Sequence, residues 1–155
     1  MIGGEIDSDY TASKDTRMSL SGWSVYLEVS PISVKSSMKK TKALSVTEAE
    51  LMVAVSCDQD IMYANRIMES LEFKVKLPMI LEVDNKGTVD LIQNWSVGGR
   101  TRHMETRQVL LRGMKDQGVF QVKWVKVDEN EVDLFTKNFP GPLFEKHCVM
   151  FNGNL

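Results

Sequence analysis

The sequence predicts a single α/β domain with a mixed β-sheet that carries helices on its faces. Three segments rich in strand-forming residues precede the first long helical pattern, which indicates an antiparallel start to the sheet. Helical and extended segments alternate after that pattern, as is typical of helix–strand crossovers. The chain has 155 residues, of which 43% are hydrophobic, so it is long and apolar enough to bury one core.

The first three strands are expected at residues 2–9, 22–29 and 32–36. The second reads Gly-Trp-Ser-Val-Tyr-Leu-Glu-Val, a composition typical of strands, and Pro31 is expected to end it. A long helix should follow, because apolar residues recur every three or four positions between residues 51 and 71. Ser45 and Glu48 fit a capping box at its start, although the run from Thr47 to Glu50 also fits a cap one turn later.

The rest of the chain is predicted to alternate between helices, strands and loops. In chain order these are a buried strand at 79–83, a short helix at 88–93, a loop at 97–99, a helix at 102–117 closed by Gly118, a strand at 119–127, a helix through Phe135 capped by Asp128 and Glu131, and a helix at 143–150. His147 is expected on the surface of that last helix.

The charge balance excludes a polybasic nucleic-acid-binding arm but not a local basic groove. Lys and Arg number 19, Asp and Glu 21, and the formal net charge is −2. The longest apolar run, residues 51–55, is far too short to span a bilayer, so no membrane partner is expected. The two cysteines form neither a disulfide framework nor a metal-ligand pair, which favours a reducing, intracellular compartment.

Carboxylates are the candidate functional groups. Asp84 follows a buried strand, at the sheet edge where open α/β sheets bind ligands, and Asp7 lies near the end of the first strand. Glu50 lies at the start of the apolar stripe of the long helix, where a lone carboxylate is costly to bury unless it is paired or metal-bound. Asp133 lies on the helix after the last strand, where a solvated acid is an equally good interpretation.

Converging carboxylates without Cys or His ligands suit hard cations such as Mg²⁺ or Mn²⁺. Two such ions can activate water and stabilise the leaving oxygen of a phosphodiester. Spacing alone does not establish that these acids converge.

Six stretches of the sequence, in order, carry a resemblance to a known family. They are Asp-Ser-Asp-Tyr (7–10) with Thr-Arg-Met-Ser-Leu-Ser-Gly-Trp (16–23), Pro-Ile-Ser (31–33), Ala-Leu-Ser-Val-Thr-Glu-Ala-Glu-Leu-Met (43–52), Val-Asp-Asn (83–85), Arg-Thr-Arg-His-Met (100–104) and Val-Asp-Leu-Phe-Thr-Lys (132–137). Over nearly its full length the chain resembles the ribonuclease H domain of copia-like LTR retrotransposon polyproteins.

The resemblance implies a ribonuclease H-like fold with a five-stranded mixed sheet. It implies hydrolysis of the RNA strand of RNA–DNA hybrids during reverse transcription, with two Mg²⁺ ions (Mn²⁺ being possible) and no small-molecule cofactor. The family's catalytic, metal-binding acids correspond to Asp7, Glu50, Asp84 and Asp133. One departure is that cellular ribonucleases H have a His in the loop before the last acid, whereas residues 125–130 contain none.

The resemblance also implies a context. The single domain, residues 1–155, is expected to be a fragment of a longer polyprotein, with residues 140–155 as a C-terminal helical extension. Its expected partners are the RNA–DNA hybrid and the reverse transcriptase domain of the same polyprotein. Its expected location is a cytoplasmic retroelement particle or the nucleus.

Several polar residues are candidates for contact with nucleic acid: Lys35, Lys39, Lys40, Asn85, Arg100, Arg102 and His103. A solvated basic turn explains the lysines nearly as well, and His103 equally suits a structural position at a helix start. The alternative function is a catalytically silent nucleic-acid-binding or tethering module from a decayed or domesticated retroelement. An integrase or transposase is disfavoured because their acids follow the order Asp, Asp, Glu, whereas Glu50 comes second here.

Overall fold

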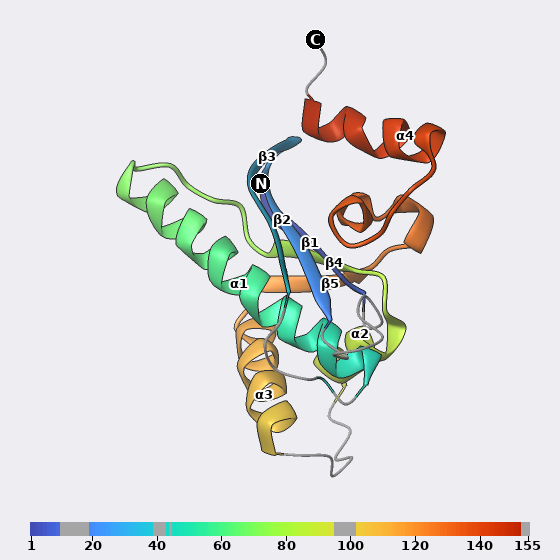
Figure 1. Ribbon diagram of the computed structural model, residues 1–155. Coiled ribbons are helices and arrows are strands. Elements are labelled where there is room, and N and C mark those ends of the chain that lie inside the picture. Colours follow the sequence, from blue (N-terminus) through green and yellow to red (C-terminus); the bar gives the residue numbers. More distant parts are fainter. Residues whose placement is uncertain (10–18, 39–42, 44, 95–101, 153–155) are drawn as a thin grey trace.

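The computed structural model describes the backbone of residues 1–9, 19–38, 43, 45–94 and 102–152, and the side chains of these residues except 102–105, 150 and 152. Five strands form one sheet in the order β3-β2-β1-β4-β5 (Figure 1). The strands are β1 (Ile2–Asp9), β2 (Leu20–Leu27), β3 (Ser30–Met38), β4 (Met79–Val83) and β5 (Phe120–Trp124). The first three pair antiparallel, and β4 pairs parallel with both β1 and β5. The predicted mixed sheet is confirmed.

The helices divide between the two faces of the sheet. Figure 1 shows α1 and α3 on one side and α4 on the other. The helices are α1 (Val46–Ser70), α2 (Lys86–Gln93), α3 (Arg102–Asp116) and α4 (Gly141–Asn152), with the short 3₁₀-helices η1 (Val127–Glu129) and η2 (Glu131–Phe135). On the α1 side, a buried stripe of the helix packs on the strands, including Leu51, Cys57 and Ile61 against Ile6 and Val25. Among the described helices, none is long and apolar enough to cross a membrane.

The start of α1 agrees with the capping prediction. The Ser45 side chain accepts a hydrogen bond from the Glu48 backbone N–H at 3.1 Å, and the helix begins at Val46. Ser45 is therefore the N-cap, and the alternative cap one turn later is wrong. This start fixes which face of α1 each following residue occupies, and it places Glu50 on the buried face.

The prediction that Pro31 ends the second strand is wrong. The chain reverses direction before Pro31, in the turn at Glu28 and Val29, where Glu28 adopts a positive φ of 57°. Pro31 lies inside β3, opposite Tyr26. Because β3 is at the edge of the sheet, a residue there can lack a backbone donor without loss of a ladder hydrogen bond.

The segment after β5 also differs from the prediction. The strand ends at Trp124 rather than residue 127, and the two 3₁₀-helices follow. Asn130, not Asp128 or Glu131, caps η2, since its side-chain oxygen accepts a hydrogen bond from the Val132 N–H at 3.2 Å. The loop predicted at 97–99 lies outside the described residues.

The close contact between β1 and α1 gives a stability prediction. A Cβ atom added at Gly4 would lie 2.5 Å from Cys57 Sγ and 2.9 Å from Ile61 Cδ1. Gly4→Ala should therefore lower the free energy of unfolding by about 1–3 kcal/mol through overpacking, measured by urea denaturation. Gly113→Ala is the control, because no atom of the described residues outside the local α3 backbone lies within 4 Å of its added Cβ, and Ala favours the helix. Equal effects of the two substitutions would contradict the packing described here.

Candidate active site

Four acidic side chains from four separate elements meet at one edge of the sheet. Because β1 and β4 are parallel neighbours, Asp7 near the end of β1 and Asp84 just after β4 lie at the same edge. The second turn of α1 brings Glu50 to this edge, and η2 brings Asp133. The fold thus brings together the four predicted acids: Asp7, Glu50, Asp84 and Asp133.

Three of these acids are close enough to share one ion. Asp7, Asp84 and Asp133 each offer a carboxylate oxygen, and these oxygens all lie within 4.8 Å of one another. Asp7 and Asp133 are each only 2% exposed, and Asp84 is half-buried. Such closely spaced, desolvated carboxylates repel one another unless protons or cations neutralise them.

Glu50 is buried beside the three aspartates. Its side chain is 2% exposed, and one carboxylate oxygen, Oε2, has no hydrogen-bond partner among the described residues. Burial raises the pKa of Glu50 well above its usual value, and the charges of Asp84 and Asp7 raise it further. The Ser8 backbone contributes a hydrogen bond that favours the charged form.

Burial and mutual repulsion also act on the two aspartates that face Asp7. Burial, followed by the Asp7 charge, raises the pKa of Asp133 to about 7. The same two causes raise the pKa of Asp84. At neutral pH the cluster therefore binds cations or protons more readily than ordinary surface carboxylates do.

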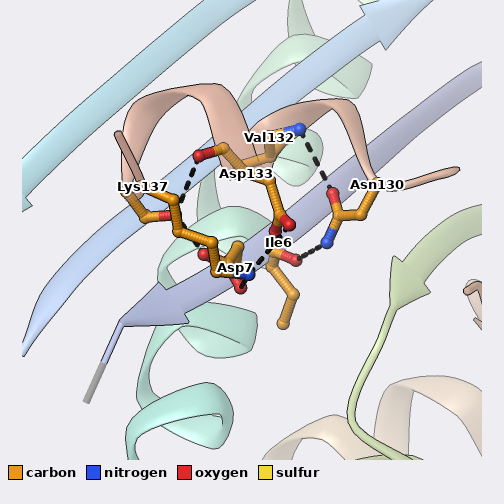
Figure 2. A network of polar contacts seen from close by, with 7 residues as sticks. Ile6, Asp7, Asn130, Val132, Asp133 and Lys137 are labelled. Carbon is orange, nitrogen blue, oxygen red and sulfur yellow. Dashed lines mark hydrogen bonds and ion pairs between the residues drawn. The ribbon is translucent and has the colours of Figure 1, made fainter. Parts of the chain in front are cut away.

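Thr136 and Lys137, which follow η2, contact the carboxylate cluster. Figure 2 shows Lys137 beside Asp7 and Asp133. The Thr136 hydroxyl donates a hydrogen bond to Asp7 Oδ2. The Lys137 ammonium lies 2.8 Å from Asp133 Oδ2 and 3.4 Å from Asp7 Oδ1. Both residues thereby tie the C-terminal part of the chain to β1.

Asn130 fixes η2 to β1 from the other end. Its side-chain NH₂ donates to the Ile6 carbonyl at 2.8 Å while its oxygen caps η2, and the residue is fully buried (Figure 2). A hydrogen bond from Asn130 also favours the charged form of Asp84. One amide thus connects β1, η2 and the acid that follows β4.

The space between β2 and η2 leaves η2 little freedom. A Cβ atom added at Gly22, the residue paired with Asp7, would lie 2.9 Å from Thr136 Cγ2 and 3.1 Å from Val132 Cγ1. On β3, the Ser36 hydroxyl donates to the Phe135 carbonyl at 2.8 Å. The absence of a side chain at Gly22 allows η2 to lie directly on the sheet and bring Asp133 up to Asp7.

Of the residues predicted to contact nucleic acid, the structure describes the side chains of Lys35 and Asn85. Lys35 forms an ion pair with Asp60 of α1 at 2.8 Å, so its ammonium already has a partner. Asn85 caps α2 by accepting a hydrogen bond from the Thr88 N–H at 3.1 Å. Lys39, Lys40 and Arg100 lie outside the described residues, as do the side chains of Arg102 and His103 at the start of α3.

The prediction that His147 lies on the surface is wrong. Its side chain is 3% exposed and stacks on Phe139, with the ring centroids 5.3 Å apart and an interplanar angle of 17°. Burial lowers the pKa of His147, which favours a neutral ring. The residue helps to dock α4 on the segment that follows η2.

Sequence reasoning missed three residues that shape the site: Asn130, Thr136 and Lys137. Asn130 precedes Glu-Val-Asp, and an Asn before a short helical run is a cap signal, but Asp128 and Glu131 beside it are equally plausible caps in the sequence. Thr136 and Lys137 belong to the stretch that carried the family resemblance, but no periodicity assigns their side chains to Asp7. Their contacts depend on two segments about 130 residues apart.

The geometry fits divalent cations. The donor set is carboxylate oxygen without Cys or His, and two buried oxygens, Glu50 Oε2 and Asp133 Oδ1, lack hydrogen-bond partners among the described residues. Unsatisfied buried oxygens are the donors that an ion of the Mg²⁺ type would use.

The fold belongs to a known class. The structure matches an LC11 ribonuclease H1 solved with an RNA/DNA hybrid at a TM-score of 0.64 and 12% identity, covering 87% of this chain and 93% of that one. It also matches the N-terminal ribonuclease H domain of a Mycobacterium tuberculosis protein, solved as a fusion with maltose-binding protein. The TM-score is 0.62 at 10% identity, covering 96% and 97% of the two chains. The protein therefore has the ribonuclease H-like fold.

Sequence comparison adds the relatives. The chain is 29% identical over 156 residues to the retrovirus-related Pol polyprotein from transposon TNT 1-94 of Nicotiana tabacum, and 26% identical over 139 residues to that from transposon RE1 of Arabidopsis thaliana. These matches cover 99% and 90% of this chain but only 12% and 10% of the polyproteins. No family model matches the chain. Together with the fold, these relatives confirm the resemblance to the ribonuclease H domain of a retrotransposon polyprotein.

A second buried acid lies on the same face of β1 as Asp7. The Tyr26 hydroxyl donates to Glu5 Oε2 at 2.7 Å, and Glu82, which faces Glu5, forms an ion pair with Lys123 at 2.7 Å. Burial raises the pKa of Glu5 to about 8; the Tyr26 hydrogen bond partly offsets this rise, and the nearby charges of Glu82 and Glu131 add to it.

These raised pKa values predict how the stability of the metal-free protein depends on pH. Folding raises the pKa of Asp133 to about 7 and that of Glu5 to about 8, so the folded state binds these protons more tightly than the unfolded state. The stabilisation from this tighter proton binding is fully present below the pKa values of the same groups in the unfolded state, about 4. It is lost as the pH rises through 7 and 8. The free energy of unfolding, measured by urea denaturation in EDTA, should therefore fall between about pH 5 and pH 8.

Glu5→Gln should make this decline shallower by at most about 1.4 kcal/mol per pH unit, the contribution of one proton. Glu145→Gln, at an exposed position of α4, is the matched control and should leave the decline unchanged. A free energy of unfolding that is constant or rises over this range would contradict the assignment of raised pKa values.

Proposed function

We propose that this domain hydrolyses the RNA strand of RNA–DNA hybrids, with two divalent metal ions held by its carboxylate cluster, during reverse transcription of a retrotransposon. The observation that carries the proposal is the convergence of Asp7, Asp84 and Asp133 within 4.8 Å, with buried Glu50 beside them, on a ribonuclease H-like fold. The similarity to retrotransposon Pol polyproteins supports the same assignment.

Each acid has a defined part in this proposal. Asp7, Glu50 and Asp84 hold the ions, and Asp133 completes the second metal position. Bound Mg²⁺, or Mn²⁺, supplies an activated water and stabilises the leaving oxygen of the phosphodiester. The protein contributes rigidity, because Asn130, Thr136 and the Ser8 backbone form hydrogen bonds with these carboxylates before any substrate arrives.

The substrate is expected to be selected by shape and by 2′-hydroxyl groups rather than by base sequence. The net charge of −2 favours weak binding of nucleic acid by the isolated domain. In a polyprotein, a reverse transcriptase domain that holds the same duplex would raise the effective concentration of hybrid at this site. Lys39, Lys40, Arg100, Arg102 and His103 remain the predicted contacts, and Lys35 would have to leave its ion pair with Asp60 to join them.

Cleavage of a labelled RNA–DNA hybrid in the presence of Mg²⁺ tests the proposal directly. Glu50→Gln should reduce the cleavage rate more than about a hundredfold, because it removes one charged metal ligand. The fold should be retained, since the Gln carbonyl can still accept the Ser8 hydrogen bond. Far-ultraviolet circular dichroism and the melting temperature check that retention.

Glu48→Gln is the matched control, two residues away on the same helix. Glu48 lies in the capped first turn of α1, and Gln also serves at that position, so cleavage should continue at the wild-type rate. Equal loss of activity in both variants would contradict the separate assignments of Glu48 and Glu50. A wild-type protein that binds the hybrid without Mg²⁺-dependent cleavage would favour the non-catalytic binding module.

A further inference from the structure

Lys137 places a positive charge inside the carboxylate cluster. Its ammonium lies 2.8 Å from Asp133 Oδ2 and 3.4 Å from Asp7 Oδ1, and its charge also acts on Glu50 and Asp84. Of the cations that the structure describes, Lys137 is the one whose ammonium contacts these acids. It therefore offsets part of their mutual repulsion.

The backbone keeps Lys137 at this position. Its N–H donates to the Asp133 carbonyl at 2.9 Å, and the preceding Thr136 is hydrogen-bonded to both Asp133 and Asp7. The start of the side chain is thus fixed beside the acids. The ammonium itself has more freedom, because the side chain is 33% exposed and borders solvent.

The Lys137 ammonium contacts carboxylate oxygens that a metal ion would need as ligands. Asp7 and Asp133 are two of the three aspartates whose oxygens could hold one metal ion, and Lys137 contacts both. A Lys ammonium and a divalent cation attract the same carboxylate oxygens, so each one weakens the binding of the other.

We propose that Lys137 is a built-in counter-cation: its ammonium neutralises the carboxylate cluster in the metal-free protein, and a divalent ion must displace it to bind. Lys137 thereby sets the affinity of the site for metal and prevents the empty cluster from destabilising the fold. This inference rests on the metal site of the proposed function. It assigns Lys137 a role in metal exchange, separate from the bond-breaking step.

Calorimetric titration of Mn²⁺ into the metal-free chain at fixed pH and ionic strength tests this inference. Lys137→Met keeps the apolar stem and removes the charge, so it should bind Mn²⁺ about tenfold more tightly than the wild type, because no ion pair must break. Lys137→Gln should behave in the same way and provides a second neutral variant. Lys137→Arg retains the charge and should keep an affinity close to that of the wild type.

Melting temperatures separate this role from a purely structural one. Without metal, Lys137→Met should melt below the wild type, because the acids lose their counter-charge. With saturating Mn²⁺ the difference should shrink or reverse, since the ion supplies the missing positive charge. Lys126→Met, at an exposed position of η1's N-terminal flank, is the matched control and should change neither the affinity nor the metal-induced shift.

Wild-type Mn²⁺ affinity in both neutral variants, or an equal loss of melting temperature with and without Mn²⁺, would overturn the inference. Hybrid cleavage by the wild type, measured in parallel, distinguishes the two proposals. Tighter Mn²⁺ binding by Lys137→Met together with an inactive wild type would support the counter-cation and contradict the nuclease. An active wild type together with unchanged Mn²⁺ binding by the variants would support the nuclease and contradict the counter-cation.

Discussion

The mutual repulsion of buried carboxylates is the constraint on which this structure depends. Four acids gather at one sheet edge with little access to water, an arrangement that costs free energy unless each charge is neutralised or hydrogen-bonded. Hydrogen bonds from Asn130 and Thr136 and the positive charge of Lys137 offset part of this free-energy cost. All three residues come from the segment around η2. The sheet and α1 provide the positions of the acids, and this segment makes their proximity tolerable.

Local rules in the sequence predicted the sheet and the positions of Glu50 and Asp84, and the family resemblance predicted the set of four acids. Alternating composition and helical periodicity set the element order, and the position of Glu50 on the α1 stripe followed from its spacing of three and four residues to the apolar positions of that helix. Asp84 followed from the rule that parallel strands end at a ligand-binding edge. Asp133 depended on the family resemblance, because the local sequence does not distinguish a buried acid on a short helix from a solvated one.

The features that sequence reasoning missed depend on contacts between distant segments. The local sequence predicts a strand end at Pro31, because it does not show that this residue lies on an edge strand of the sheet. The sequence of the last helix predicts an exposed His147, because Phe139, which covers its ring, lies on a separate segment. Nothing in the sequence around Lys137 distinguishes it from a solvated lysine, and only the folded chain shows the carboxylates that it faces.

The hydrogen bonds between η2 and β1 have a consequence for the order in which the chain emerges during synthesis. The Asn130–Ile6 contact joins residues 124 positions apart, and the Thr136–Asp7 contact joins residues 129 apart. A ribosome-bound chain that has released every strand of the sheet still lacks Asp133 and the groups that brace it. Such an intermediate holds Asp7, Glu50 and Asp84 without Thr136 or Lys137, so the carboxylate cluster stays incomplete until residues 130–137 leave the exit tunnel. Any chain that stops after β5 but before residue 130 therefore keeps the five strands but lacks one acid of the cluster and all three groups that brace it.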